Sequence, residues 1–104
     1  MNERLGKMRE FGQAPWVDEL SRDDTRNGGL QSMIESGIVG VTSNPAIFQK
    51  AVAGSDLYDD QLQELARNTD DPKEMFWGIA GTDIQEACDV LAPVYENSGG
   101  VDGF

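Results

Sequence analysis

The segment 38–42, with the sequence IVGVT, constrains the fold of this chain more than any other feature. It is apolar and rich in β-branched residues, which is typical of a strand covered on both faces in a parallel sheet. Asn44 and Pro45 follow it directly. Asparagine is a preferred N-cap and proline suits the first helical turn, so a helix is predicted to begin there. A strand that leads at once into a helix is the repeating unit of α/β folds.

The rest of the chain repeats this alternation. The segment 15–18 (PWVD) predicts an earlier short strand, because proline is tolerated at the first position of a strand. Asp71, Pro72 and Glu74 predict the N-cap and first turn of the helix with the strongest apolar periodicity, which Pro93 is expected to bend or end. The predicted helices occupy residues 3–11, 30–37, 45–53, 55–65 and 72–91, and a third strand is predicted to begin at 101–104.

The predicted fold class is therefore α/β with a parallel sheet and a high helix content. Two strands and the start of a third do not make a stable parallel sheet. A (β/α)₈ barrel takes roughly 250 residues, whereas this chain has 104. We expect the opening portion, about two and a half βα units, of a barrel or a doubly wound sheet.

Composition excludes several function classes. The formal net charge of −11, with 8 basic residues among 19 acidic ones, argues against nucleic acid and against anionic membrane surfaces as partners. No run of about 18 apolar residues predicts a membrane span. The N-terminus lacks the apolar region of a secretory signal. Together with a single cysteine, this indicates a cytoplasmic protein.

The residue types available also limit the chemistry. The chain has no histidine, so histidine-based catalysis is excluded and no metal site is expected. Any catalysis must use carboxylates, lysine or hydroxyls. Cys88 lies on the apolar side of the last helix and is expected in the core. Trp16 and Trp77 are interpreted as packing residues.

Polar side chains follow both predicted strands. Asp18 and Glu19 end the first, and Thr42, Ser43 and Asn44 end the second. Functional groups of parallel α/β folds collect at the carboxyl ends of strands. A solvated acid, two turn residues and a helix cap would explain the same residues without a function. A carboxylate beside hydroxyl and amide groups at one rim, opening into one cavity, suits proton transfer on a polyhydroxylated substrate.

Four segments carry a resemblance to a known family. Residues 11–22 (FGQAPWVDELSR) resemble the opening of bacterial transaldolases, and residues 40–51 (GVTSNPAIFQKA) look like their second-strand signature. Residues 58–62 (YDDQL) and 83–91 (DIQEACDVL) are similar to the helices that follow. The resemblance covers residues 11–104. It implies the N-terminal portion of a (β/α)₈ barrel, with an N-terminal helix over 1–12 and the start of the barrel over 15–104.

The resemblance also implies a function and roles for residues. Transaldolases move a dihydroxyacetone unit between sugar phosphates of the pentose phosphate pathway through a lysine Schiff base, without a metal or an organic cofactor. By its motif, Asp18 would be the catalytic proton shuttle. Asn44 would hydrogen-bond the dihydroxyacetone moiety, and Thr42 and Ser43 would complete the substrate-binding loop. Sugar phosphates are the implied partners.

The chain departs from the family pattern at the nucleophile. The family's Schiff-base lysine lies on a later strand, whereas Lys7, Lys50 and Lys73 all fall on predicted helices and are interpreted as surface residues. The family's third-strand glutamate would fall just past Phe104, and its phosphate-binding arginine much later. The isolated chain is therefore expected to be inactive.

Two other functions stay open on the sequence. A related Schiff-base aldolase would cleave sugar phosphates without transferring the product. An acidic helical module that binds a protein partner would instead be a monodisperse, folded 104-residue species. The preferred sugar phosphate, the oligomeric state and any fused second enzyme are not indicated by these residues.

Overall fold

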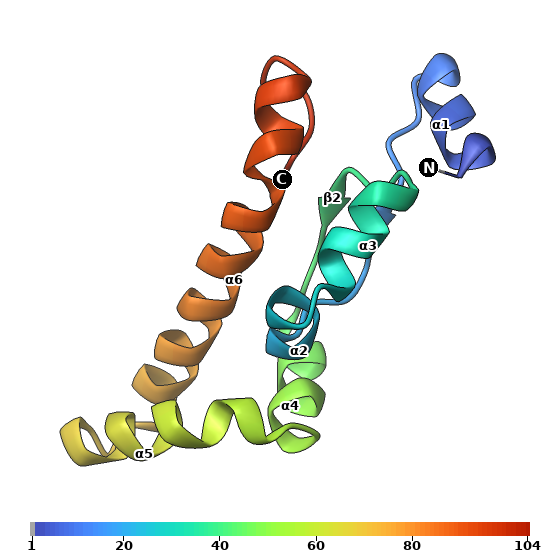
Figure 1. The fold of residues 1–104 in the computed structure, drawn as a ribbon. Coiled ribbons are helices and arrows are strands. Elements are labelled where there is room, and N and C mark those ends of the chain that lie inside the picture. Colours follow the sequence, from blue (N-terminus) through green and yellow to red (C-terminus); the bar gives the residue numbers. More distant parts are fainter. Residues whose placement is uncertain (1) are drawn as a thin grey trace.

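Two short strands lie side by side at the centre of the molecule. The computed structural model describes residues 2–104 and contains β1 (Trp16–Val17) and β2 (Gly40–Val41). They pair in parallel, with Trp16 opposite Gly40 and Val17 opposite Val41. The predicted parallel pair is confirmed, although each strand is shorter than its apolar run. Figure 1 shows β2 near the centre of the molecule, between α6 and α3 in this view.

The last residues run along the other edge of β2. The Gly103 N–H donates to the Val39 carbonyl (2.9 Å), and the Val41 N–H donates to the Phe104 carbonyl (2.8 Å). The predicted third strand is nevertheless not formed over 101–104. Gly103 has a φ of +91°, outside the extended region that a strand requires. The segment therefore occupies the position of a neighbouring strand without its regular geometry.

Between residue 2 and β2 the structure has four helical elements. They are α1 (Glu3–Met8), the 3₁₀ turn η1 (Arg9–Phe11), α2 (Arg22–Arg26) and α3 (Gly29–Ser36). Side-chain caps explain two of the starts, since Asn2 accepts from the Arg4 N–H (3.0 Å) and Ser21 from the Asp24 N–H (3.2 Å). The predicted helix over 3–11 is thus an α-helix with a 3₁₀ end.

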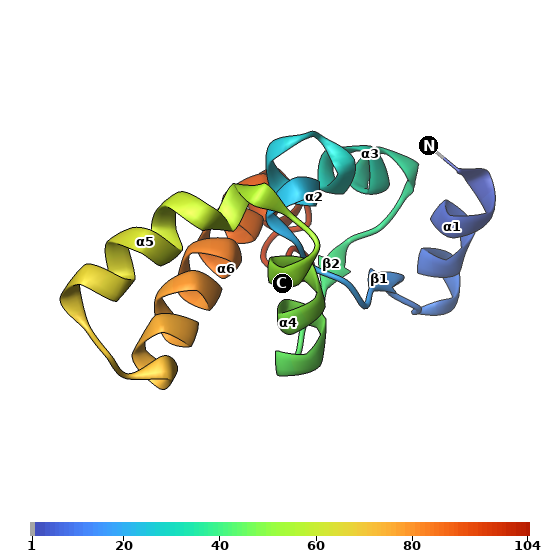
Figure 2. The ribbon, with the colours of Figure 1, turned by 90° about the horizontal axis from the view of Figure 1, so that it is seen from below.

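Four helical elements follow β2. They are α4 (Pro45–Ala53), the 3₁₀ turn η2 (Asp56–Tyr58), α5 (Asp59–Asn68) and α6 (Pro72–Asn97). The predicted caps at Asn44, Ser55 and Asp71 are all present. Pro93 does not end α6, which continues for four more residues. Figure 2 shows α5 running beside the first turns of α6.

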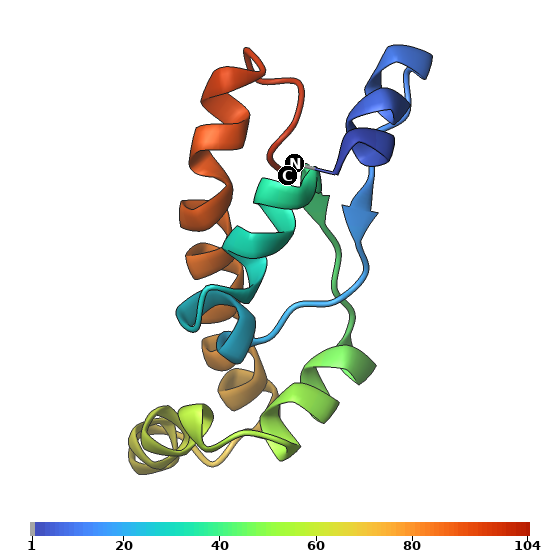
Figure 3. The same cartoon turned by 45° about the vertical axis from the view of Figure 1, so that its right-hand side comes forward.

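The apolar core lies on one face of the sheet. It contains buried Leu20, Leu30, Phe48, Ala80 and Ala87, with Val17 and Val41 packed against it. Figure 3 shows α6 and α3 on the same side of the strands. The second strand was predicted to be covered on both faces: Gly40 is buried and Val41 is half-buried, and the Trp16 ring of β1, itself 44% exposed, covers Gly40 on the face away from the core. That face carries the indole ring folded over Gly40, where an added Cβ would fall 2.4 Å from the ring.

The molecule is elongated. Its radius of gyration is 15.4 Å and its extents are 49 × 24 × 20 Å, whereas a compact chain of this length has a radius near 13 Å. Two expected core residues are consequently on the surface: Trp77 is 68% exposed and Cys88 is exposed. Within residues 2–104, no helix combines the length and apolarity needed to cross a bilayer.

Candidate active site at the strand ends

Asp18 and Thr42 meet at the carboxyl ends of β1 and β2. Successive side chains of a strand alternate between faces. Asp18 therefore follows Trp16, and Thr42 follows Gly40, on the face away from the core. The Thr42 Oγ1 hydroxyl donates to Asp18 Oδ1 at 2.7 Å, and both residues are exposed. The structure thus brings a carboxylate and a hydroxyl together where a ligand has access.

Asn44 occupies the N-cap of α4. Its Oδ1 accepts from the Ile47 N–H at 3.1 Å, which is the expected cap contact. Its side-chain Nδ2 donates to no group among residues 2–104, and the residue is exposed. Asn44 therefore caps the helix with one end of its amide and keeps a free donor at the other.

Ser43 lies between these two residues and points elsewhere. Its Oγ atom is buried and has no hydrogen-bond partner among the described residues. A buried hydroxyl without a partner typically costs about 1–3 kcal/mol. The loop 42–44 therefore holds one polar group whose hydrogen bonding is incomplete in this structure.

The site residues line two neighbouring hollows. A cleft of about 390 Å³ between β1 and α4, the β1–α4 cleft, is lined by Asp18, Glu19, Ser21 and Lys50 among others. A cavity of about 360 Å³ between β2 and α6, the β2–α6 cavity, is lined by Thr42, Ser43 and Asn44 and by apolar residues of α6. Asp18 and Asn44 were expected to open into one cavity. Instead, Asp18 lines the β1–α4 cleft and Asn44 lines the β2–α6 cavity. The hydrogen bond between Asp18 and Thr42 connects a residue of the cleft with a residue of the cavity.

The three lysines lie on helices, as predicted. Lys7 is on α1, Lys50 on α4 and Lys73 on α6, and all three are exposed. The amine of a Schiff-base lysine typically lies in an enclosed, apolar pocket. These three side chains face solvent instead. Among residues 2–104, no group of three or more potential metal ligands is present.

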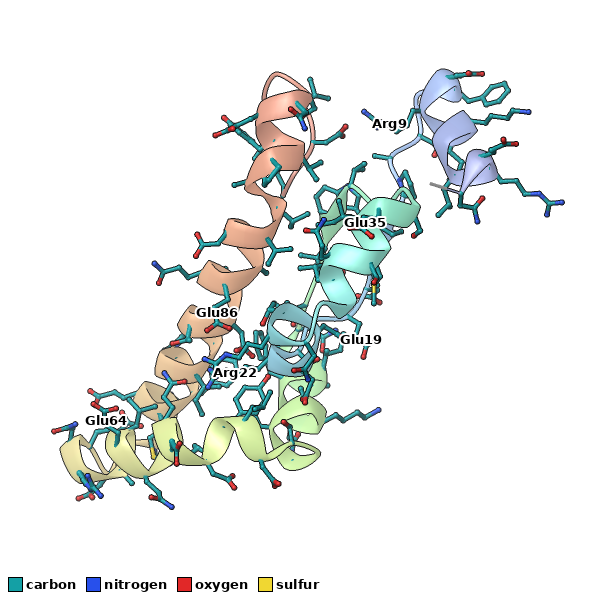
Figure 4. All side chains as sticks on the ribbon, viewed as in Figure 1. Arg9, Glu19, Arg22, Glu35, Glu64 and Glu86 are labelled. Carbon is teal, nitrogen blue, oxygen red and sulfur yellow. The ribbon has the colours of Figure 1, made fainter. Side chains whose placement is uncertain are left out.

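A buried polar cluster lies behind the strand ends and was not predicted. It consists of Arg22, Tyr58 and Asp83, each 1% exposed or less. Arg22 Nε donates to Asp83 Oδ1 (2.7 Å), and the Tyr58 hydroxyl donates to Asp83 Oδ2 (2.6 Å). The Arg22 guanidinium also lies 4.3 Å from the centre of the Tyr58 ring. Figure 4 shows Arg22 directed from α2 toward α6.

One sequence signal could have revealed this cluster. Asp83 falls between Ala80 and Ala87, at the spacing of the buried face of α6. A carboxylate within an apolar face requires a buried partner, because an unpaired buried charge is costly. Burial and the hydrogen bond to Asp83 raise the pKa of Tyr58 well above its ordinary value, so this phenol stays protonated at neutral pH.

Two further ion pairs connect distant parts of the chain. Arg26 on α2 pairs with Glu86 on α6 at 2.7 Å, and this contact lowers the pKa of the Glu86 carboxyl. Arg9 of η1 pairs with Asp102 at 2.5 Å and so joins the N-terminal helix to the segment beside β2. None of these four residues lines the β1–α4 cleft.

The geometry defines a class of protein: parallel βα units with polar groups at the strand ends are typical of α/β enzymes. Residues 15–104 match the family model described as transaldolase/fructose-6-phosphate aldolase. The chain belongs to this family, as the residue resemblance predicted.

Curated relatives agree with this assignment. The chain is 48% identical over 104 residues to a transaldolase of Frankia alni, 46% identical over 103 residues to one of Mycobacterium marinum, and 44% identical over 100 residues to one of Neisseria gonorrhoeae. These alignments cover 99%, 98% and 96% of this chain, respectively, and 28% of each relative. The chain therefore spans just over a quarter of the length of the curated relatives it matches.

Proposed function

We propose that these residues form part of a transaldolase, which transfers a dihydroxyacetone unit between sugar phosphates of the cytoplasmic pentose phosphate pathway. The observation that carries the proposal is the Asp18–Thr42 pair at two adjacent parallel strand ends, within a chain of this family. By family resemblance, the parallel pair and the segment beside it are the first part of a (β/α)₈ barrel.

Asp18 is the proposed proton shuttle. Cleavage of the bond between two sugar carbons requires removal of a proton from the neighbouring hydroxyl, and the reverse reaction requires its return. An exposed carboxylate at a strand end can do both. Thr42 donates to Oδ1 of this carboxylate, which leaves Oδ2 free to take the proton.

The loop 42–44 is the proposed contact with the dihydroxyacetone unit. Asn44 offers its free Nδ2 donor to a substrate oxygen while its Oδ1 continues to cap α4. Ser43 has a hydroxyl without a partner, which a substrate oxygen could satisfy after a small shift of the loop. Uncharged groups of this kind suit a polyhydroxylated ligand.

The proposed nucleophile lies outside these 104 residues. Because Lys7, Lys50 and Lys73 are exposed and helical, we assign the Schiff-base lysine to another part of the barrel. That amine would form the covalent link to the ketose without a metal or an organic cofactor. The 104-residue chain alone should show no turnover of fructose 6-phosphate with erythrose 4-phosphate.

A hybrid protein tests the proposal. Residues 1–104 would replace the corresponding segment of the Frankia alni transaldolase, which is 48% identical to them. We expect the hybrid to transfer the three-carbon unit from fructose 6-phosphate to erythrose 4-phosphate. Asp18→Asn, which preserves shape but removes the base, should lower kcat by about 10²–10⁴-fold.

The matched control is Asp56→Asn, since Asp56 is also an exposed acid but lies on η2. It should leave kcat unchanged. A folded hybrid with no transfer activity, or an Asp18→Asn hybrid as active as its parent, would contradict the proposal. The same assay without erythrose 4-phosphate tests the second candidate, an aldolase, which the family description also includes. Rapid release of glyceraldehyde 3-phosphate without an acceptor would favour it.

A further inference from the structure

The connection from β1 to α2 is short and carries Asp18. Only residues 18–21 separate Val17, the last residue of β1, from Arg22, the first residue of α2. The β1 end of this connection is held by the ladder to β2, where the Thr42 N–H donates to the Val17 carbonyl at 2.9 Å. The position of the Asp18 carboxylate therefore depends on what holds the other end, at the start of α2.

Tyr58 holds that end. The Arg22 backbone N–H donates to the Tyr58 hydroxyl at 2.8 Å. A donor in the first turn of a helix has no partner within the helix, so the tyrosine hydroxyl acts as a cap contributed from η2, 36 residues away. The same hydroxyl donates to Asp83 Oδ2 at 2.6 Å, which fixes its orientation.

We propose that Tyr58, backed by Asp83, is a positioning residue for Asp18. The inference rests on the proposed function of Asp18. The phenol fixes the start of α2, and the connection 18–21 is then restrained at both ends. Leu20, 3% exposed, packs into the core midway along this connection and limits its movement further. Tyr58 itself lies in the interior and does not line the β1–α4 cleft.

The same contacts could serve only to pack α2 against α6, and the chain offers a matched control for that role. Arg26 and Glu86 also join these two helices, at the far end of α2 from the connection. Arg26→Ala removes an interaction between the same helices without touching the start of α2. A purely structural role predicts similar behaviour for changes at both ends.

The test uses the active hybrid of the proposed function. Tyr58→Phe keeps the ring beside the Arg22 guanidinium but removes both hydrogen bonds of the hydroxyl. We expect kcat to fall by about 10-fold, with KM unchanged within about 2-fold, because a displaced base slows the proton transfer but not substrate binding. Arg26→Ala should leave kcat unchanged.

A double-mutant cycle with Asp18→Asn isolates the coupling. If Tyr58 acts through Asp18, adding Tyr58→Phe to the Asp18→Asn hybrid should lower the residual kcat no further. Circular dichroism at the assay temperature checks folding. If Tyr58→Phe is unfolded, Ser21→Ala replaces it, since Ser21 Oγ accepts from the Asp24 N–H at the same helix start. Ser21→Ala should lower kcat by about 2–3-fold, and it should lower the residual kcat of the Asp18→Asn hybrid no further.

Three outcomes would overturn the inference. These are an unchanged kcat in the folded Tyr58→Phe hybrid, an equal loss of kcat in Arg26→Ala, or a full further loss in the Asp18→Asn background. In each of them, Asp18→Asn alone still lowers kcat, and the proposed function stands. Full activity of the Asp18→Asn hybrid would instead contradict both the proposed function and this inference.

Discussion

At the residue scale, Asn44 combines a helix cap with a free amide donor, which we propose contacts the substrate. Its Oδ1 accepts from the Ile47 N–H and its Nδ2 is free. Asn44→Asp keeps the acceptor at the cap but replaces the donor by a second acceptor. In the active hybrid we expect the free energy of unfolding to stay within about 0.5 kcal/mol of the parent, while KM for fructose 6-phosphate rises. Urea titration and steady-state kinetics measure the two effects.

Asn44→Ala provides the comparison, since it removes both groups. It should raise KM and also lower the free energy of unfolding by about 1 kcal/mol, the usual cost of a lost cap. An Asn44→Asp hybrid with an unchanged KM would show that the free amide does not contact the substrate. In that case Asn44 would be a helix cap alone.

Tyr58 gives a prediction for alkaline pH. Burial, together with the hydrogen bond to Asp83, raises the pKa of this phenol in the folded state above its unfolded value near 10. A group with a raised folded pKa stabilises the fold fully below its unfolded pKa, and this contribution is lost as the pH rises above it. The hybrid should therefore lose stability above about pH 10 more steeply than its Tyr58→Phe variant.

Urea titrations at pH 7 and near pH 11 measure that difference. Tyr95→Phe is the control, because Tyr95 is 47% exposed. Between the two pH values, the free energy of unfolding of the Tyr95→Phe hybrid should fall by as much as that of the parent. Equal pH dependence of the parent and Tyr58→Phe would contradict the assignment of a buried, protonated phenol.

Sequence patterns placed Asp18 and Thr42 at one rim of the sheet, where they are in contact, but did not predict the cluster behind them, and the reason is physical. Two-residue periodicity and the parallel pairing of adjacent strands are enough to place Asp18 beside Thr42. The Tyr58–Asp83 and Arg22–Asp83 contacts join residues 25 and 61 positions apart. They depend on how η2 and α6 pack against α2, which no local pattern specifies.

At the element scale, β2 depends on a close contact with β1. An added Cβ at Gly40 would lie 2.4 Å from the Trp16 ring. This ring is partly exposed, so it can move aside, but it would then lose its packing against Gly40. Gly40→Ala should lower the free energy of unfolding of the hybrid by about 1–3 kcal/mol. The Trp16 emission spectrum should shift as the ring moves, and thermal unfolding measures the loss.

Gly81→Ala is the matched control, because an added Cβ there meets nothing within 4 Å and Gly81 lies inside α6. It should raise the free energy of unfolding by about 0.5–1 kcal/mol, since glycine weakens a helix interior. A Gly40→Ala hybrid as stable as its parent would contradict the close packing of the two strands.

The helix starts were predictable because their caps are local. Asn44, Ser55 and Asp71 each bond to a backbone N–H two or three residues ahead. The ends of α3 and α4 at glycines were also predicted, but the end of α6 and the third strand were not. Pro93 is accommodated within α6. The segment 101–104 bonds to β2 but is turned by glycines with positive φ, and its pairing depends on residues more than 60 positions away.

At the scale of the whole molecule, large apolar side chains are exposed along one side of α6 and beside β2. The β2–α6 cavity is bordered by large apolar side chains that are strongly exposed, with Trp77 at 68%, Phe104 at 56% and Ile84 at 47%. The elongated shape has the same origin, since helices cover the strands from one direction only. In the proposed barrel, further βα units would cover these side chains.

This exposed face makes a prediction for the 104-residue chain by itself. Apolar patches of this kind drive association in water, while the net charge of −11 opposes it through repulsion between copies. We expect association that increases with protein concentration and is stronger in about 0.5 M sodium chloride, which screens charges beyond a few ångströms.

Two variants test whether the exposed face drives this association. Trp77→Glu should reduce the association, whereas Leu57→Glu, at a partly exposed residue on η2, should not. Sedimentation velocity measures the association. A folded monomer at all concentrations, in high salt as in low, would contradict the prediction and would favour an independent protein-binding module over a part of a barrel.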